Sequence, residues 1–260
     1  MMPTAPIPDG PVRPHPTLDG HYGTDAARPR WVRGLFDETA VEYDGVAKWL
    51  AFGSGPWYRR HVLKLAGLRP SMTALDVAAG TGQVTRAAAG IVGEAGRVYA
   101  VEPSRGMLTQ ARRVALPQVV LVQGEAEALP LPDNSVDFVS MGYAVRHVSD
   151  LVRAFSEYRR VLRPGGTVII MEIGPVQGRL ARTALGVWIS HGVPALHGVF
   201  SRGEGRHARA RALMGYYRDT LDNCVAPEVI AGALGQAGFT DVESILSLRL
   251  FREYTGRKPA

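Results

Sequence analysis

Short apolar runs alternate with segments of helical periodicity through the middle of the chain, as they do when strands alternate with helices. The apolar runs predict strands at residues 73–78, 97–102, 119–123, 136–141 and 166–172. Between them, apolar positions recur at helical spacing and predict helices at residues 83–91, 105–115 and 150–162. This alternation predicts a parallel sheet covered by helices, and hence an α/β fold with a Rossmann-like, doubly wound sheet.

The segments on either side of this alternation predict a helical cap, a lid and a sheet edge. Residues 29–68 have helical periodicity, interrupted between Gly53 and Pro56, and we expect an N-terminal cap there. Residues 175–215 break the rhythm, and we expect a lid or substrate insertion. A helix at about residues 226–237 and two short strands after it complete seven strands, mostly parallel with an antiparallel edge strand.

The composition fits one globular domain that follows a proline-rich stretch. The chain has 260 residues, of which 46% are hydrophobic, and this is ample for a core. Residues 1–28 are rich in proline and lack the apolar core of a signal peptide, so we expect a disordered tail before one domain at residues 29–260. A single cysteine, Cys224, excludes an intrachain disulfide, and no apolar run reaches membrane-spanning length, so we expect a cytoplasmic protein.

The formal net charge of +6 makes the distribution of basic residues relevant to possible partners. A basic run of this kind could bind RNA, contact an anionic or quinone-like substrate, or form a solvated helix face. We expect no nucleic-acid partner, and RNA binding stays an alternative. The densest run consists of Arg202, Arg206, His207, Arg209 and Arg211, with Tyr216 and Tyr217 just beyond it.

The glycine-rich turn after the first predicted strand indicates a ligand site. Gly80 and Gly82 allow the backbone to adopt positive φ and to approach a ligand closely. Glu102 ends the next strand, twenty residues later, where a carboxylate can accept hydrogen bonds from both hydroxyls of a ribose. A dinucleotide site would have glycine in place of Thr85, and Asp76 would repel a phosphate but suits a sulfonium with its amino group. These residues predict S-adenosylmethionine (SAM) as the cofactor.

Six motifs in order resemble class I SAM-dependent methyltransferases, and specifically the ubiquinone/menaquinone biosynthesis C-methyltransferases. The resemblance covers about residues 31–173 and implies a Rossmann-like enzyme that transfers a methyl group from SAM. The motifs are VRGLFDETAVEYD, LDVAAGTGQVT, VEPSRGML, GEAEALPLPDNSVDFV, YAVRHVSD and YRRVLRPGGTVIIMEI.

The resemblance also implies which residues hold the cofactor. It places the glycine loop at the methionine side of SAM, Glu102 at the ribose, and Glu125 with Ala126 at the adenine amine. Met107 is either a packing surface for the adenine or a core residue, and Tyr43 is either a cover over the cofactor or a core tyrosine. The full cofactor set is Tyr43, Asp76, Ala78, Gly80, Gly82, Glu102, Met107, Glu125, Ala126 and Tyr143.

The acceptor is expected at the end of the fourth strand, because ligands of open α/β sheets lie outside the carboxyl ends of the strands. His147 is the first candidate for a base that deprotonates a phenolic hydroxyl, and Tyr217 and His191 are weaker ones. His147 could instead cap the next helix or face solvent. Arg146 could stabilise the phenolate or pair with Asp150. The similar quinone enzymes usually have Asn where this chain has His147, which leaves the acceptor open.

These features together predict methyl transfer from SAM to a small aromatic acceptor, quinone-like or hydroquinone, with methylation at carbon favoured. The alternatives are O- or N-methylation of a natural product, SAM-dependent amination of a quinone as in rhodoquinone formation, and RNA methylation. No metal is expected, because the histidines show no paired ligand spacing beyond His191 and His197. Peripheral membrane contact and oligomeric state stay open.

Overall fold

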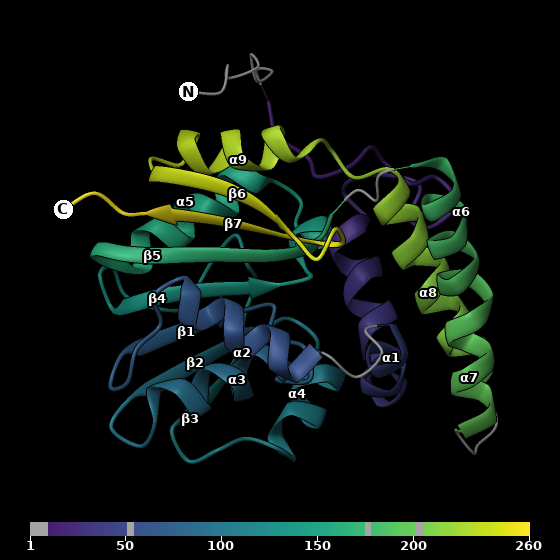
Figure 1. Ribbon diagram of the computed structural model, residues 1–260, viewed down its shortest axis with the longest axis horizontal. Helices are drawn as coiled ribbons and strands as arrows, with labels where there is room; N and C mark the ends of the chain where they lie inside the picture. Colours follow the sequence, from purple (N-terminus) through teal and green to yellow (C-terminus); the bar gives the residue numbers. More distant parts are fainter. Residues whose placement is uncertain (1–9, 51–54, 175–177, 201–204) are drawn as a thin grey trace.

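A seven-stranded sheet forms the centre of the computed structural model, which describes residues 10–50, 55–174, 178–200 and 205–260 (Figure 1). The strand order is β3-β2-β1-β4-β5-β7-β6, and all neighbours are parallel except that β7 is antiparallel to both β5 and β6. The predicted Rossmann-like fold is confirmed. The strands are β1 Thr73–Val77, β2 Arg97–Glu102, β3 Val119–Gln123, β4 Val136–Gly142, β5 Leu162–Ile173, β6 Thr240–Ser247 and β7 Phe251–Arg257.

Helices cover both faces of the sheet, and successive residues of the central strands enter opposite cores. In β1, Ala74 packs into one core, whereas Leu75 and Val77 pack into the other. This follows because side chains alternate along a strand. The first core contains α2 Gly55–Leu65 and α3 Gln83–Val92, and the second contains α5 Leu151–Val161 and α9 Pro227–Gln236. The remaining sheet helix, α4 Arg105–Arg112, packs beside β2 and β3.

The largest difference from the predicted boundaries of the sheet is the start of β5. The apolar pattern predicts a strand from residue 166, but the structure begins β5 at Leu162. Val136 of β4 pairs with Leu162 and Phe138 pairs with Thr167, so the residues between them bulge out of the ladder. Proline and glycine in this bulge hide the strand from a search for apolar periodicity.

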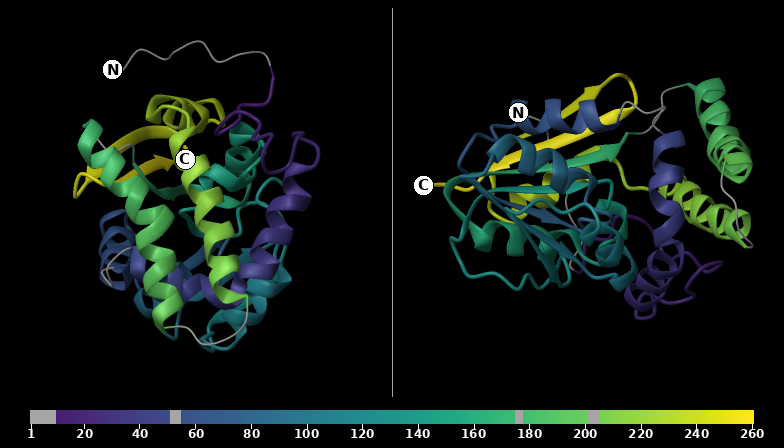
Figure 2. Two further views of the ribbon diagram at one scale, coloured as in Figure 1. Left: turned by 90° about the vertical axis from the view of Figure 1, so that its right-hand side faces the viewer. Right: turned by 90° about the horizontal axis from the view of Figure 1, so that it is seen from below.

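A separate layer of helices stands across the carboxyl ends of the parallel strands (Figures 1 and 2). Apolar side chains of this layer, including Val46, Val193 and Leu213, form a core of their own. The segment predicted as a lid, residues 175–215, is helical at residues 179–200 and 206–215, and residues 175–177 and 201–204 lie outside the described residues. The layer consists of α1 Arg28–Leu50, α6 Arg179–Val187, the π-helical turn η2 Trp188–Gly192, α7 Val193–Phe200 and α8 Arg206–Asp222.

Residues 10–27 form a segment that we call the N-terminal strap, and the prediction of a disordered tail is wrong for them. Val12 is only 6% exposed, and its carbonyl accepts a hydrogen bond from the Leu151 amide at 2.8 Å. The Pro14 carbonyl accepts one from the Val225 amide at 2.8 Å. Proline cannot donate to a regular ladder, but its carbonyl still accepts, so the strap is held without secondary structure. Residues 1–9 lie outside the described residues.

Val12→Ala is expected to lower the free energy of unfolding by about 2 kcal/mol, because it removes buried methyl groups that the strap packs into the core. Urea unfolding followed by circular dichroism measures the change. The matched control is Val41→Ala, since Val41 is 54% exposed and its truncation should alter stability by less than about 0.5 kcal/mol. Equal stabilities for the two variants would show that the strap is not part of the folded domain.

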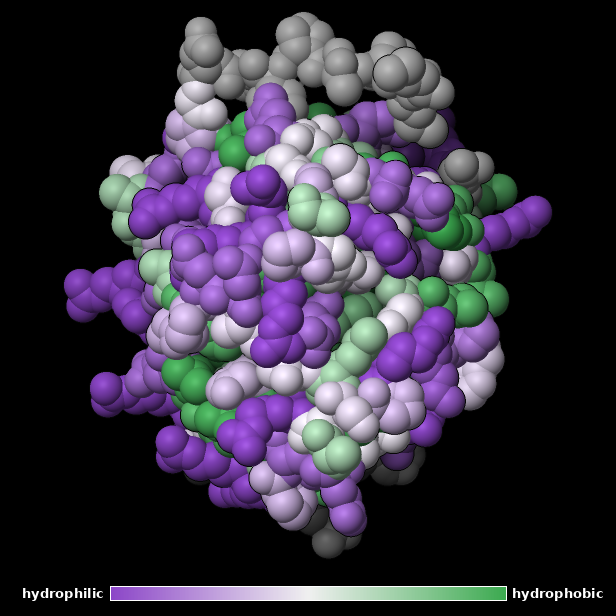
Figure 3. Space-filling view, turned by 90° about the vertical axis from the view of Figure 1, so that its left-hand side faces the viewer, coloured by the Kyte–Doolittle hydropathy of each residue, from purple (hydrophilic) through white to green (hydrophobic). Residues whose placement is uncertain are grey.

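The face at the amino ends of the parallel strands is mainly hydrophilic, with small apolar groups between the polar residues (Figure 3). Among the residues that the structure describes, no helix combines the length and apolar character needed to cross a bilayer. A cavity lies at the opposite, carboxyl ends of the parallel strands, where α1 and α8 of the helical layer contribute to its lining.

Candidate functional site

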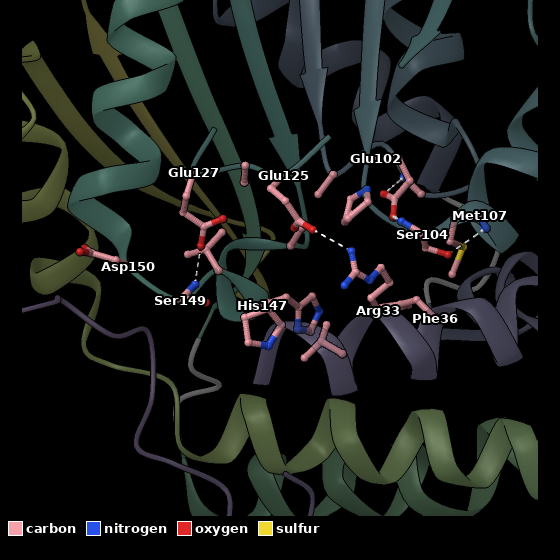
Figure 4. A pocket seen from close by; sticks show the side chains of 18 of the residues that line it. Arg33, Phe36, Glu102, Ser104, Met107, Glu125, Glu127, His147, Ser149 and Asp150 are labelled. Carbon is pink, nitrogen blue, oxygen red and sulfur yellow. Dashed lines mark hydrogen bonds and ion pairs between the residues drawn. The ribbon is translucent and has the colours of Figure 1, made fainter. Parts of the chain in front are cut away.

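A cavity of about 640 Å³ opens at the carboxyl ends of β1 to β4 (Figure 4). Its wall comes from the loops that follow these strands, from α1, from the N-terminal strap and from α8. The strand order reverses between β1 and β4, and open α/β sheets bind ligands at such a reversal. The volume is in the range of a cofactor site that also admits a small second ligand.

The glycine loop after β1 presents bare backbone to this cavity. Ala78 and Gly80 both have positive φ, 53° and 57°, and both line the cavity. A β-carbon on Gly80 would have no atom within 4 Å, so the space above it is open to a ligand. Gly82 does not line the cavity; its φ of 83° makes the turn into α3, and a β-carbon there would face Ala111. Gly80 is therefore the glycine that admits a ligand, and Gly82 shapes the turn.

Glu102 is held in a single orientation at the end of β2. Its Oε2 accepts a hydrogen bond from the Gly80 amide at 2.8 Å, and its Oε1 accepts one from the Ser104 amide at 2.9 Å. Each oxygen keeps a lone pair for a further donor. Burial raises the pKa of Glu102 to about 7. The side chain lines the cavity and can accept from two neighbouring hydroxyls, as a ribose requires.

Asp76 lies buried in β1, below the glycine loop. The Thr85 hydroxyl donates to its Oδ2 at 2.6 Å, and the Ser140 hydroxyl donates to its Oδ1 at 3.1 Å. Burial raises the pKa of Asp76 to about 6, although these hydrogen bonds lower it. A dinucleotide site would have glycine at position 85. In this chain the Thr85 side chain instead holds the Asp76 carboxylate. Asp76 lines a smaller cavity that adjoins the loop.

The loop after β3 forms the far end of the cavity. Glu125 lies 3.2 Å from the guanidinium of Arg33 on α1, and the two half-exposed side chains meet across the opening (Figure 4). Met107 is buried and lines the cavity beside Ser104 (Figure 4), and its amide donates to the Ser104 hydroxyl at the start of α4. Ala126 is also buried in the lining. An adenine would meet Met107 and the Glu125 carboxylate here.

Two aspartates of α1 connect the helical layer to the cofactor loops. Asp37 accepts hydrogen bonds from the Ser104 hydroxyl at 2.7 Å and from the Gly106 amide at 2.8 Å. Asp44 accepts from the Thr81 hydroxyl at 2.5 Å. Seven residues separate the two aspartates, so they project from one face of the helix. Asp37 and Arg33 could not be predicted as site residues from the sequence, because charged residues on a helix usually indicate a solvated face.

His147 lines the cavity from the short 3-10 turn η1 Val145–His147 after β4. Its Nδ1 is 3.1 Å from the Tyr216 hydroxyl, and its buried Nε2 has no hydrogen-bond partner among the described residues. Burial and the nearby charges of Arg146 and Arg28 hold the pKa of His147 well below its usual value. His147 does not cap α5, because Asp150 accepts the terminal amides of that helix. A neutral imidazole therefore lies at the cavity wall.

Arg146 is completely buried behind this histidine and does not line the cavity. Its Nε lies 3.1 Å from a carboxylate oxygen of Glu172 on β5, and its Nη1 donates to the Thr220 hydroxyl at 2.6 Å. Its guanidinium also lies 5.1 Å from the centre of the Tyr217 ring. The carboxylate partner is thus Glu172 and not Asp150. Arg146 fixes the turn that carries His147 and is not placed to touch an acceptor.

Most residues of the predicted site meet in one place. Tyr43 and Tyr217 join α1 to α8 through hydroxyls 3.0 Å apart. His191 is exposed on η2 and, like Gly82 and Arg146, is absent from the cavity wall. The predicted residues that line the cavity are Tyr43, Ala78, Gly80, Glu102, Met107, Glu125, Ala126, Tyr143, His147 and Tyr217.

Comparison with known proteins identifies the family. A family model described as the ubiE/COQ5 methyltransferase family matches residues 24–243. The chain belongs to this family. A demethylmenaquinone methyltransferase from Symbiobacterium thermophilum is 33% identical over 237 residues, which cover 89% of this chain and 94% of that protein. A ubiquinone/menaquinone biosynthesis C-methyltransferase from Shewanella sp. strain ANA-3 is 35% identical over 156 residues, covering 58% of this chain and 62% of that protein.

A solved structure supports the fold of this ubiE/COQ5-family methyltransferase. The SAM-dependent methyltransferase from Aquifex aeolicus aligns with a TM-score of 0.57 over 77% of this chain and 89% of that chain. At 21% identity this likeness bears on the fold alone. The family membership confirms the predicted enzyme class and cofactor: the protein is a SAM-dependent methyltransferase.

The cavity of this ubiE/COQ5-family methyltransferase has room for SAM and carries charges that suit it. Glu102 offers two oriented oxygens to a ribose, and the bare backbone at Gly80 leaves room beside it. Asp76 and Asp44 supply negative charge near the glycine loop, where the positively charged methionine end would lie. We propose that these residues, with Met107 and Glu125 at the adenine, hold the cofactor.

The affinity of the enzyme for SAM is expected to rise about tenfold between pH 6 and pH 8. Only the ionised Glu102 can accept from both ribose hydroxyls, and burial raises the pKa of this carboxyl to about 7. Below that pH the carboxyl must lose a proton before SAM binds, so affinity is lost as the pH falls. Calorimetric titration at several pH values measures the slope. Glu102→Gln should bind SAM more weakly, and its affinity should depend much less on pH. An unchanged dependence of affinity on pH would assign the titration to another group.

Proposed function

We propose that this methyltransferase methylates a ring carbon of a quinone-derived hydroquinone. The observation that carries the proposal is the neutral His147 at the cavity wall, whose Nε2 has no partner among the described residues. The aromatic rings of Phe36, Tyr216 and Tyr217 lie between 5.2 and 5.8 Å from the His147 ring. Phe36 and Tyr217 also line the cavity and offer an apolar surface to a flat acceptor, whereas Tyr216 is buried and does not line it. The names of the Symbiobacterium and Shewanella relatives support a quinone precursor.

Bound SAM supplies a methyl group on a positively charged sulfur, which an electron-rich carbon can attack. The chain has to orient the acceptor and move one proton. In the proposed tautomer, His147 Nδ1 donates to the Tyr216 hydroxyl, and Nε2 accepts the proton of a hydroquinone hydroxyl. The resulting phenolate raises the electron density of the neighbouring ring carbon, which forms the new C–C bond while the S–C pair of electrons goes to sulfur.

After methyl transfer, one proton has to leave the ring carbon and one has to return to the oxygen. After methyl transfer the ring carbon carries both its hydrogen and the new methyl group, and the former phenolate oxygen is a carbonyl. The ring hydrogen leaves as a proton to solvent, and the oxygen recovers its proton from the His147 imidazolium. Burial and the nearby arginines disfavour the imidazolium, so His147 returns the proton readily.

We further propose that helices α6 to α8 form the lid over the acceptor, since Tyr217 of α8 lines the cavity.

The RNA alternative is disfavoured by the surroundings of the basic run. Arg209 and Arg206 lie 2.8 and 3.8 Å from the buried carboxylate of Glu42, and Tyr216 and Tyr217 are buried. These arginines therefore join α8 to α1 and do not form a free basic face. Arg202 lies outside the described residues.

An anaerobic assay with a reduced and an oxidised prenylated naphthoquinone tests the proposal. The enzyme and SAM are incubated with each form, and mass spectrometry identifies all products. Only the hydroquinone should gain a methyl group, because the quinone has no hydroxyl proton for His147 and a ring poor in electrons. Equal methylation of both forms contradicts the proposed base, and a mass change that is not a methyl group supports another transfer, such as amination.

A further inference from the structure

Arg59, on α2, is a buried cation that has no anionic partner among the residues the structure describes. Its side chain is 8% exposed, and among the described residues no carboxylate lies within ion-pair distance of it. Its Nε has no hydrogen-bond partner there, and its guanidinium lies 5.3 Å from the centre of the Tyr143 ring. A guanidinium removed from water and left unpaired is costly to the folded state. Such a group is expected where a ligand supplies the missing anion.

The surroundings of Arg59 show where that anion would lie. Arg59 lines the small cavity beside the glycine loop, together with Asp76, Gly80 and Tyr143. The absence of a side chain at the buried Gly55 leaves room for the guanidinium, because a β-carbon there would collide with it. The Arg59 charge also lowers the pKa of Asp76, against the larger effect of burial, so its field reaches the loop. The loop therefore has an acidic group on the strand beneath it and a basic group beside it.

We infer that Arg59 binds the carboxylate of the methionine part of SAM. That part carries one anion, the carboxylate, and two cations, the ammonium and the sulfonium. Asp76 and Asp44 are acidic groups near the loop and suit the cations, and Arg59 is the basic group that lines the loop's small cavity. A guanidinium matches a carboxylate with two parallel hydrogen bonds. The inference rests on the SAM site alone and is independent of the acceptor.

The test compares SAM with decarboxylated SAM, which keeps the sulfonium and the amine but lacks the carboxylate. Calorimetry on the full-length protein, without acceptor, gives both affinities. The wild type should bind SAM about 10- to 100-fold more tightly than decarboxylated SAM. Arg59→Met should weaken SAM binding by a similar factor and change the affinity for decarboxylated SAM by no more than about twofold. The reason is that the substitution and the loss of the carboxylate remove the same interaction. Arg59→Lys should restore part of the difference.

A control and a stability measurement separate this role from a structural one. Arg60→Met is the matched control, since Arg60 is exposed and, within the described part of the chain, its side chain donates to the Gly90 carbonyl alone. It should leave both affinities unchanged. Without ligand, Arg59→Met should be at least as stable to heat as the wild type, because it removes an unpaired buried charge.

Two results would overturn the inference. One is an equal loss of affinity for both ligands in Arg59→Met, which would make Arg59 a structural residue. The other is equal affinity of the wild type for the two ligands, a measurement that needs no variant. Neither depends on which acceptor is methylated, so a failure here is distinct from a failure of the hydroquinone proposal.

Discussion

His147→Phe is expected to lower the turnover number about 10²- to 10⁴-fold, while SAM affinity stays within about twofold. Phenylalanine keeps a flat ring among Phe36, Tyr216 and Tyr217, but it has no nitrogen to accept the hydroxyl proton. The cofactor loops do not depend on His147, because it contacts neither Glu102 nor the glycine loop. Steady-state rates with a hydroquinone acceptor and calorimetry with SAM measure the two quantities.

Two further variants sharpen this expectation. His61→Phe makes the same substitution at an exposed histidine stacked on Trp57 of α2 and should leave turnover unchanged. His147→Asn introduces the residue that the similar quinone enzymes usually have, which can form hydrogen bonds but is not a useful base. If His147 takes the proton in this chain, the variant should remain at least about tenfold slower than the wild type. Near-normal turnover of His147→Asn would mean that the residue orients the acceptor and takes no proton.

Glu172→Leu is expected to lower the free energy of unfolding by about 3 to 5 kcal/mol, because it leaves the Arg146 guanidinium buried without its carboxylate. Arg146→Met combined with Glu172→Leu should recover much of this loss, since no charge then remains in the core. Urea unfolding of both variants and of the two single substitutions completes a double-mutant cycle.

The surface pair of Arg218 and Asp222 provides the control for this cycle. These side chains are 46% and 52% exposed and lie 3.5 Å apart, so Asp222→Ala should cost less than about 1 kcal/mol. If Glu172→Leu is no more destabilising than Asp222→Ala, the buried pair does not stabilise the turn that carries His147.

The alternation of strands and helices was predictable because the central strands are buried on both faces and read as unbroken apolar runs. The predicted limits of the strands at residues 97–102 and 119–123 agree with β2 and β3. The residues of the glycine loop and Glu102 were predictable for a different reason. A tight turn after one strand and a carboxylate at the end of the next are local features, and their spacing fixes their positions in the sheet.

The rest of the site depends on contacts between distant parts of the chain. Local spacing suggested Asp150 as the partner of Arg146, but β4 and β5 are neighbours in the sheet, which brings Glu172 to it. The strap was predicted to be disordered from its composition. Composition does not show that Val12 and His15 are buried and form hydrogen bonds with residues more than 100 positions away. Arg59 carried no signal in the sequence, because only the folded structure shows that no carboxylate of the described residues pairs with it.

The measurement that tests the central claim most directly uses a demethylated naphthohydroquinone with deuterium at its free ring carbon. The enzyme and SAM are incubated with this acceptor without oxygen, and the product is analysed by mass spectrometry. Methylation at carbon replaces the deuterium, so the product should gain a methyl group and lose the label. A product that gains a methyl group and keeps the deuterium would place the methyl on oxygen, and the absence of any methylated product would contradict a hydroquinone as the acceptor.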